Sequence, residues 1–184
     1  MQNTKTSSSQ LNRPSLEAFK LAEKTGVHII LNNIRSAQNI GSIFRTADAF
    51  NVKKIFITGI SAIPPHKEIL KTALGATESV VWEYHENAVL LIQTLKSKGE
   101  KIYAIEQTSN SILLQDFTYN SESIITIIMG NEVDGVDQNL IDLCDGSIEI
   151  PQFGTKHSLN VAVSTGIVLW HFMNQILQKN ENLK

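Results

Sequence analysis

The chain has 184 residues, of which 42 % are apolar and 18 % are charged, and its formal net charge at pH 7 is −2. This length and composition fit one folded domain with a full hydrophobic core, and they exclude a fibrous or wholly disordered chain. The single cysteine, Cys144, excludes a disulfide framework, and no apolar run approaches the roughly 18 residues of a membrane span. We therefore expect a cytoplasmic protein without a membrane segment or an export signal.

Residues 1–13 are polar and predict a disordered tail, and residues 14–184 predict a single domain. A short helix is expected over 15–25, with Ser15 as its N-cap and Gly26 at its end. Six runs rich in Ile and Val then alternate with helical stretches, which predicts an α/β fold with a parallel sheet flanked by helices. The expected strands are 27–31, 54–59, 79–84, 101–106, 124–130 and 147–151, and the helices between them are 38–50, 67–74, 86–98 and 136–144.

The last helix is expected from Ser158 to about Lys179, and its first four turns are apolar almost all round. Its apolar side chains cannot share one stripe, so the helix must be buried on several sides. A second copy of the chain would supply that burial, and we predict a homodimer built on this helix. Burial within a single monomer is the alternative.

Two loops that contain glycine follow the last two expected strands, GNEVDG at 130–135 and PQFGTKHSLN at 151–160. In an open parallel sheet, ligands bind at the carboxyl ends of the strands, and glycine lets the backbone approach a ligand closely. A glycine loop alone is more often a simple turn. The chain has no G-x-G-x-x-G after a strand and no P-loop, which disfavours the common modes of nucleotide binding.

A third segment, NIRSAQNIGSIFRTAD at 33–48, follows the first expected strand and places Asn39 and Arg45 on one helix. Arg45 is either a surface ion-pair partner of Asp48 or a guanidinium that faces a phosphate or an oxyanion. Lysine and arginine predominate over residues 35–71, whereas residues 105–151 contain acids and neither of these bases. This asymmetry indicates either two solvated faces or a cationic patch for a polyanion.

In this order and spacing, the segments NIRSAQNIGSIFRTAD, IIMGNEVDGV and IEIPQFGTKHSLNVAVSTGI resemble the three motifs of the SpoU (TrmH) family of RNA 2'-O-ribose methyltransferases. The resemblance spans about residues 27–175. It implies the SPOUT fold, a parallel α/β sheet with a deep C-terminal trefoil knot, which sequence rules alone would not propose. It also implies a homodimer, S-adenosyl-L-methionine as methyl donor and a nearly minimal catalytic domain.

On the family pattern, Arg45 stabilises the 2'-oxyanion of the acceptor ribose, and Asn39 orients Arg45 or the ribose. The arginine of one subunit faces the cofactor of the other. The resemblance assigns three more residues to the catalytic site, Glu132, Ser158 and Asn160, and it assigns four to cofactor binding, Gly130, Ile150, Gly154 and Leu159. Each catalytic assignment has a structural alternative: Ser158 could cap the last helix, Asn160 could bond loop backbone, and Glu132 could complement a helix N-terminus.

The cationic stretch then becomes a candidate RNA surface made by Arg35, Lys53, Lys54, Lys67 and Lys71. We expect a structured RNA substrate, with transfer RNA favoured over ribosomal RNA. Two alternatives remain open: a catalytically silent RNA-binding module of the same fold, and a base methyltransferase of a related knotted family. The histidines lack ligand spacing, so no metal is expected.

Overall fold

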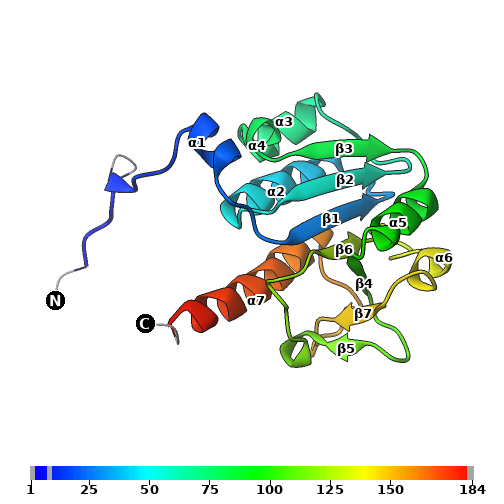
Figure 1. Cartoon of the computed structure of the whole chain (residues 1–184). Helices are drawn as coiled ribbons and strands as arrows, with labels where there is room; N and C mark the ends of the chain where they lie inside the picture. The colour runs from blue at the N-terminus through cyan, green and yellow to red at the C-terminus, as the bar shows by residue number, and fades with distance from the viewer. Residues whose placement is uncertain (1–2, 8–9, 182–184) are drawn as a thin grey trace.

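The computed structural model describes residues 3–7 and 10–181, and its strands form one seven-stranded sheet in the order β3-β2-β1-β6-β4-β7-β5 (Figure 1). Every pairing within the sheet is parallel. The strands are β1 (Val27–Asn32), β2 (Lys54–Thr58), β3 (Trp82–His85), β4 (Lys101–Ile105), β5 (Ile112–Leu113), β6 (Ile125–Met129) and β7 (Gly146–Glu149). The predicted tail includes residues 1–2 and 8–9, which lie outside the described residues, and its disorder stays a prediction.

Helices cover both faces of the sheet, as the alternating pattern predicted (Figure 1). Helices α2, α3, α4 and α7 pack over one face, and α5 and α6 pack over the other. The helices are α1 (Leu16–Leu21), α2 (Ala37–Ala49), α3 (Lys67–Ala73), α4 (Ala76–Ser79), α5 (Ala88–Ser97), η2 (Leu114–Asp116), α6 (Gln138–Ile141) and α7 (Val161–Glu181). Among the described residues, no helix has the length and hydropathy that crossing a membrane requires.

Several predicted boundaries were wrong for local reasons. The strand expected from Ser79 begins at Trp82, because Ser79 ends the short helix α4 and its hydroxyl donates to the carboxylate of Asp48. The first helix is capped by Ser15 as predicted, but it ends at Leu21 and not at Thr25. The N–H of Thr25 instead donates a hydrogen bond to the carbonyl of Asn51. Strand β5 was missed because two residues carry no periodic signal.

Helix α7 begins at Val161, three residues later than predicted. Asn160 caps it, because its Oδ1 accepts hydrogen bonds from the N–H groups of Ala162 (2.9 Å) and Val163 (3.4 Å). The prediction that Ser158 caps this helix was therefore wrong. One side of the helix is buried against the sheet, while an apolar stripe of Val163, Ile167 and Trp170 stays exposed. Burial of the whole apolar surface within one monomer is thus excluded, and the homodimer stays a prediction.

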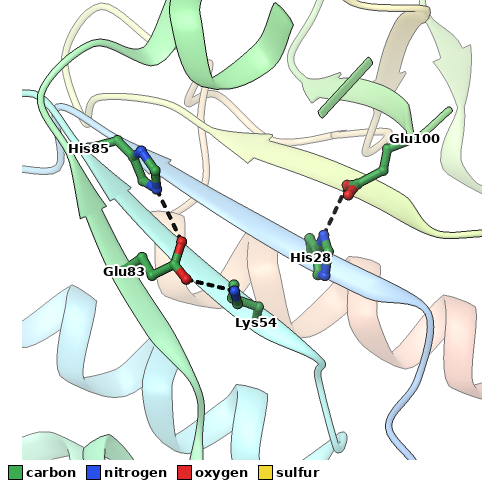
Figure 2. A network of polar contacts seen from close by, with 5 residues as sticks. All are labelled: His28, Lys54, Glu83, His85 and Glu100. Atoms are coloured by element: carbon green, nitrogen blue, oxygen red, sulfur yellow. Dashed lines mark hydrogen bonds and ion pairs between the residues drawn. The ribbon is translucent and has the colours of Figure 1, made fainter. Parts of the chain in front are cut away.

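A buried polar cluster connects the beginnings of three strands, and Figure 2 shows its contact between His28 and Glu100. Nδ1 of His28 on β1 lies 2.9 Å from Oε2 of Glu100, and the Thr126 hydroxyl donates to the same oxygen at 2.7 Å. Burial opposes ionisation of Glu100, but its contacts with His28 and Thr126 outweigh that effect and lower its pKa. In contrast, Glu83 pairs with Lys54 at the surface of the same sheet face (Figure 2).

We predict that Glu100→Gln lowers the free energy of unfolding by about 1.5–3 kcal/mol at pH 7, the range for hydrogen bonds to a charged group. Because the folded-state pKa is depressed, this contribution is complete above the ordinary value of 4.5 and is lost as the pH falls below it. Urea unfolding between pH 7 and pH 3 measures the difference. The matched variant Glu83→Gln, in an exposed ion pair, should cost about 1 kcal/mol or less. A loss for Glu100→Gln that does not change with pH would contradict this assignment.

Candidate functional site

Strands β1, β4, β6 and β7 end at one edge of the sheet, and a cavity of about 490 Å³ opens there. Its volume is within the range of about 300–1,000 Å³ that small-molecule pockets occupy. The loops after β4, β6 and β7 supply most of its wall. Of the predicted cofactor and catalytic residues, six line this cavity: Gly130, Glu132, Ile150, Ser158, Leu159 and Asn160. Sequence motifs far apart in the chain therefore meet at one place.

The carboxylate of Glu132 joins the loop after β6 to the segment that follows β1. It accepts hydrogen bonds from the N–H of Arg35 (2.9 Å), the N–H of Ser36 (3.0 Å) and Nδ2 of Asn39 (3.0 Å). Burial of Glu132 raises its pKa, but these hydrogen bonds outweigh that effect, and the net pKa is lowered. Ser36 caps α2 through its own side chain, so Glu132 holds a helix start that is already formed. Glu132 is thus a positioning residue between the first two motifs.

Asn39 extends this connection to the third motif. Its Oδ1 accepts a hydrogen bond from Nδ2 of Asn160 at 3.1 Å, while Oδ1 of Asn160 caps α7. The three side chains Glu132, Asn39 and Asn160 therefore form a continuous hydrogen-bonded junction, which we call the motif junction. Bonding to backbone was the alternative role that the sequence analysis predicted for Asn160. Asn160 has this role, and its side chain also contacts Asn39. Ser158 lies on the exposed rim of the cavity and donates to no neighbour among the described residues.

The loop at 130–135 folds tightly on itself. A Cβ on Gly130 would lie 2.2 Å from the backbone of Gly135, and Gly135 has a φ of +71°, where side chains are disfavoured. Asn131, which the sequence analysis did not single out, accepts hydrogen bonds from the N–H groups of Val133 (2.8 Å) and Asp134 (3.2 Å). Its Nδ2 also donates to the Asn33 carbonyl at 2.8 Å. The loop is therefore held both internally and against the end of β1.

Glu106, at the end of β4, is a second site residue that the sequence analysis missed. Its carboxylate accepts hydrogen bonds from the N–H of Val136 (3.0 Å) and the N–H of Gln107 (2.8 Å). A Cβ on Gly135 would approach Oε2 of Glu106 to 2.1 Å, so the glycine is required for this contact. A single Glu after an apolar run carries no recognisable pattern, and only the fold brings it to the loop.

The charge of the cavity wall is one-sided. Four acidic residues line it, Glu106, Glu132, Asp134 and Glu149. No lysine or arginine of the described chain lines it, and His157 is its one basic-type side chain. Met129, Ile148 and Ile150 add an apolar wall. The cavity therefore suits a ligand with an apolar flat part and a positive charge. Among the described residues, no group of side chains could hold a metal ion.

Arg45 lies outside this cavity. It is exposed on α2, and it forms no ion pair or hydrogen bond within the part of the chain that the structure describes. Asp48, its alternative partner from the sequence, instead accepts the Ser79 hydroxyl. The surface ion-pair interpretation of Arg45 is therefore wrong, and its guanidinium is free to meet another molecule. Gly154, predicted to bind the cofactor, is exposed on the loop after β7 and lines a separate, adjoining cavity.

The predicted RNA-binding residues are divided between two edges of the sheet. Lys53 and Lys54 lie where β2 begins, at the edge opposite the cavity, and Nζ of Lys54 is bonded to Glu83 at 2.8 Å. Arg35 lies in the segment held by Glu132. Lys67 and Lys71 lie on α3, whose first turn contacts the start of α2 through a Glu68–Gln38 hydrogen bond. Arg35 and the α3 lysines are therefore nearer to the cavity than Lys53 and Lys54.

A sequence profile of the SpoU rRNA methylase family matches residues 26–170, which is most of the chain. The chain belongs to this family. One relative is a 23S rRNA (guanosine-2'-O-)-methyltransferase of Neisseria meningitidis, 32 % identical over 84 % of this chain and 61 % of the relative. Another is a tRNA (guanosine(18)-2'-O)-methyltransferase of Aquifex aeolicus, 27 % identical over 82 % of this chain and 70 % of the relative. The chain thus spans less than two thirds of the Neisseria protein.

Solved structures show the same fold. The TrmH/SpoU tRNA modifying enzyme of A. aeolicus superposes with a TM-score of 0.79 and 26 % identity, covering 90 % of this chain and 84 % of that chain. An rRNA methyltransferase of Sinorhizobium meliloti, solved with AdoMet bound, superposes with a TM-score of 0.77 and 25 % identity over 86 % of this chain and 60 % of that chain. The predicted parallel α/β architecture is confirmed. The trefoil knot stays a prediction.

We predict that Gly135→Ala lowers the free energy of unfolding by about 2–4 kcal/mol, the sum of left-handed strain and overpacking against Glu106. Gly154→Ala is the matched control, because a Cβ there meets nothing within 4 Å. Its effect should stay within about 0.5 kcal/mol. Chemical denaturation of both variants measures the contrast, and equal losses would contradict the role given to the 130–135 loop.

Proposed function

We propose that this chain transfers a methyl group from S-adenosyl-L-methionine to a ribose 2'-hydroxyl of a structured RNA. The observation that carries the proposal is that the second and third family motifs line one cavity, and that Asn39 of the first motif is bonded to both of them in the motif junction. The relatives named above, an RNA 2'-O-methyltransferase for ribosomal RNA and another for transfer RNA, support the reaction. The chemistry of the cavity supports the methyl donor.

The residues of the cavity fit S-adenosylmethionine on three counts. Ile150 and Leu159 offer apolar surface for a flat base. Gly130 and Gly135 let the two ends of the 130–135 loop pack closely together, which fixes the shape of the wall that would face the nucleoside. The carboxylates of the wall complement a sulfonium. When bound, this donor supplies a methyl group that is already activated by its positive sulfur.

The remaining chemistry requires a group that makes a ribose hydroxyl nucleophilic, and we assign it to Arg45. Guanidinium is always protonated in proteins, so Arg45 acts by stabilising negative charge on the 2'-oxygen rather than as a free base. As the oxygen–carbon bond forms, the sulfur–carbon bond breaks, and the hydroxyl proton leaves to an adjacent phosphate or to water. Asn39, on the same helix, is a positioning residue, because its side chain is engaged by both Glu132 and Asn160.

A homodimer brings this arginine to a cofactor. Arg45 does not line the cavity of its own chain, and we therefore propose that a second copy completes the site. The exposed stripe of Val163, Ile167 and Trp170 on α7 offers the apolar surface for that association, and Trp170 is 56 % exposed. Helix α2, which carries Arg45, packs on α7 and therefore lies beside this stripe. In our proposal, Arg45 of each chain faces the cavity of its partner.

The RNA is proposed to lie across Arg35 and the α3 lysines Lys67 and Lys71, with Lys53 as a more distant phosphate contact. Lys54 is a weaker candidate than the sequence suggested, because its amino group is paired with Glu83. The relatives include enzymes for both transfer RNA and ribosomal RNA, and we retain transfer RNA as the proposed substrate class. Action on these RNAs agrees with the proposed cytoplasmic location.

We predict that Arg45→Ala lowers kcat for methyl transfer by about 10²–10³-fold, the usual cost of losing a group that stabilises an oxyanion. The dissociation constant for S-adenosylmethionine should change by less than about two-fold, because Arg45 is assigned to the ribose oxygen and not to the methyl donor. Labelled methyl donor with total RNA from cells that lack the enzyme gives kcat, and calorimetry gives the affinity. Arg13→Ala removes an exposed arginine of the N-terminal segment and is the matched control. Retained kcat in Arg45→Ala would contradict the assigned role.

The shared site is tested by mixing two inactive chains. Arg45→Ala lacks the guanidinium, and Leu159→Trp fills the cofactor cavity with an indole ring. In a mixed dimer made by co-expression, one of the two sites combines the intact cavity of the first chain with the intact arginine of the second. Activity should therefore return in the mixture. An inactive mixture that sedimentation shows to contain mixed dimers would place both parts of the site in one chain.

A further inference from the structure

A second cavity, of about 370 Å³, adjoins the first. It lies between the loop after β7 and the outer side of α7, where Ile167, at the border of the proposed dimer stripe, forms part of its wall. The two cavities share wall residues, among them Ile150, Ser158 and Leu159. These shared residues form the rim between the two cavities, and a ligand could extend across this rim from one cavity into the other.

Phe153 is the most unusual residue of this second cavity. Its side chain is 98 % exposed, the largest value among the exposed large apolar side chains of the described chain. It makes no aromatic contact with any described residue, whereas the buried Phe44, Phe117 and Phe172 each pack against another ring. A ring with both faces in water offers a flat surface on which another ring can stack.

The charge of the second cavity is opposite to that of the first. Four acidic residues line the first cavity, whereas none of the described residues that line the second is acidic. Lys156 is the charged residue in the wall of the second cavity, and within the described chain its amino group has no ion-pair partner. A cavity with an aromatic ring, an apolar wall and a free ammonium complements a nucleobase with its attached phosphate.

We propose that the second cavity binds the base and a flanking phosphate of the nucleotide whose ribose is methylated. Phe153 stacks on the base and Lys156 contacts the phosphate. The inference rests on the proposed function. When the 2'-hydroxyl reaches the methyl donor in the first cavity, the base of the same nucleotide lies only one sugar ring away. That distance places the base on the other side of the shared rim, in the second cavity. A single-stranded or extruded base is required, since a stacked base in a duplex presents no face to the ring.

The test compares four substitutions at Phe153 and Lys156 in the full chain. Phe153→Ala should raise the KM for RNA by roughly 5- to 160-fold, from the stacking energy of about 1–3 kcal/mol per base. Phe153→Trp keeps a stacking face and should stay close to the unaltered chain, whereas Phe153→Leu keeps apolar surface without a ring and should resemble the alanine variant. Lys156→Gln should reduce the salt dependence of RNA binding by about 0.7 in the slope of log K against log salt concentration.

Two measurements separate this site from other roles of the loop. The affinity for S-adenosylmethionine and the sedimentation mass should both be unchanged in Phe153→Ala. Leu21→Ala, at another highly exposed apolar side chain, is the control and should leave the KM for RNA unaltered. An altered mass for Phe153→Ala would assign the ring to contact between copies of the chain and overturn the proposal, as would an unchanged KM. If the unaltered chain methylates no RNA, the proposed function itself fails, together with the nucleotide site.

Discussion

The carboxylate of Glu132 connects parts of the chain that the sequence keeps almost one hundred residues apart. Its two oxygens accept three hydrogen bonds from the segment after β1, and Asn39 passes the connection on to Asn160 and the start of α7. A carboxylate that accepts backbone N–H groups beside a helix start is favoured by charge and by geometry. The position of the cavity relative to α2, and hence to Arg45, follows from this one set of contacts.

The two sides of the proposed reaction are divided by charge. The cavity wall is acidic and suits a positive methyl donor, while Arg45, Arg35 and the α3 lysines lie outside it and suit an RNA backbone. In the proposed mechanism, this division makes the association of two chains part of the chemistry, because neither surface alone holds both reactants.

Much of the fold was predictable because strands that are buried on both faces consist of short runs rich in Ile and Val, as in β1 and β6. The cavity residues were predictable only through the family resemblance, since Gly130 and Leu159 have ordinary structural explanations when taken alone. The predicted start of α7 was wrong because two nearby residues, Ser158 and Asn160, are both of types that favour the N-cap position. Which of them caps the helix depends on the backbone conformation, and in the structure it is Asn160. Glu106 and Asn131 could not be found because their partners are backbone groups that the fold brings to them.

The most direct test of the motif junction is amide hydrogen exchange in Glu132→Ala compared with the unaltered chain. The account predicts that protection falls together in the segment 33–40, which loses the hydrogen-bond acceptor of two amides, and in the start of α7, which loses its support through Asn39. Protection in β1 and β6 should stay unchanged. Loss confined to residues 130–135 would contradict the claim that Glu132 holds the three motifs together.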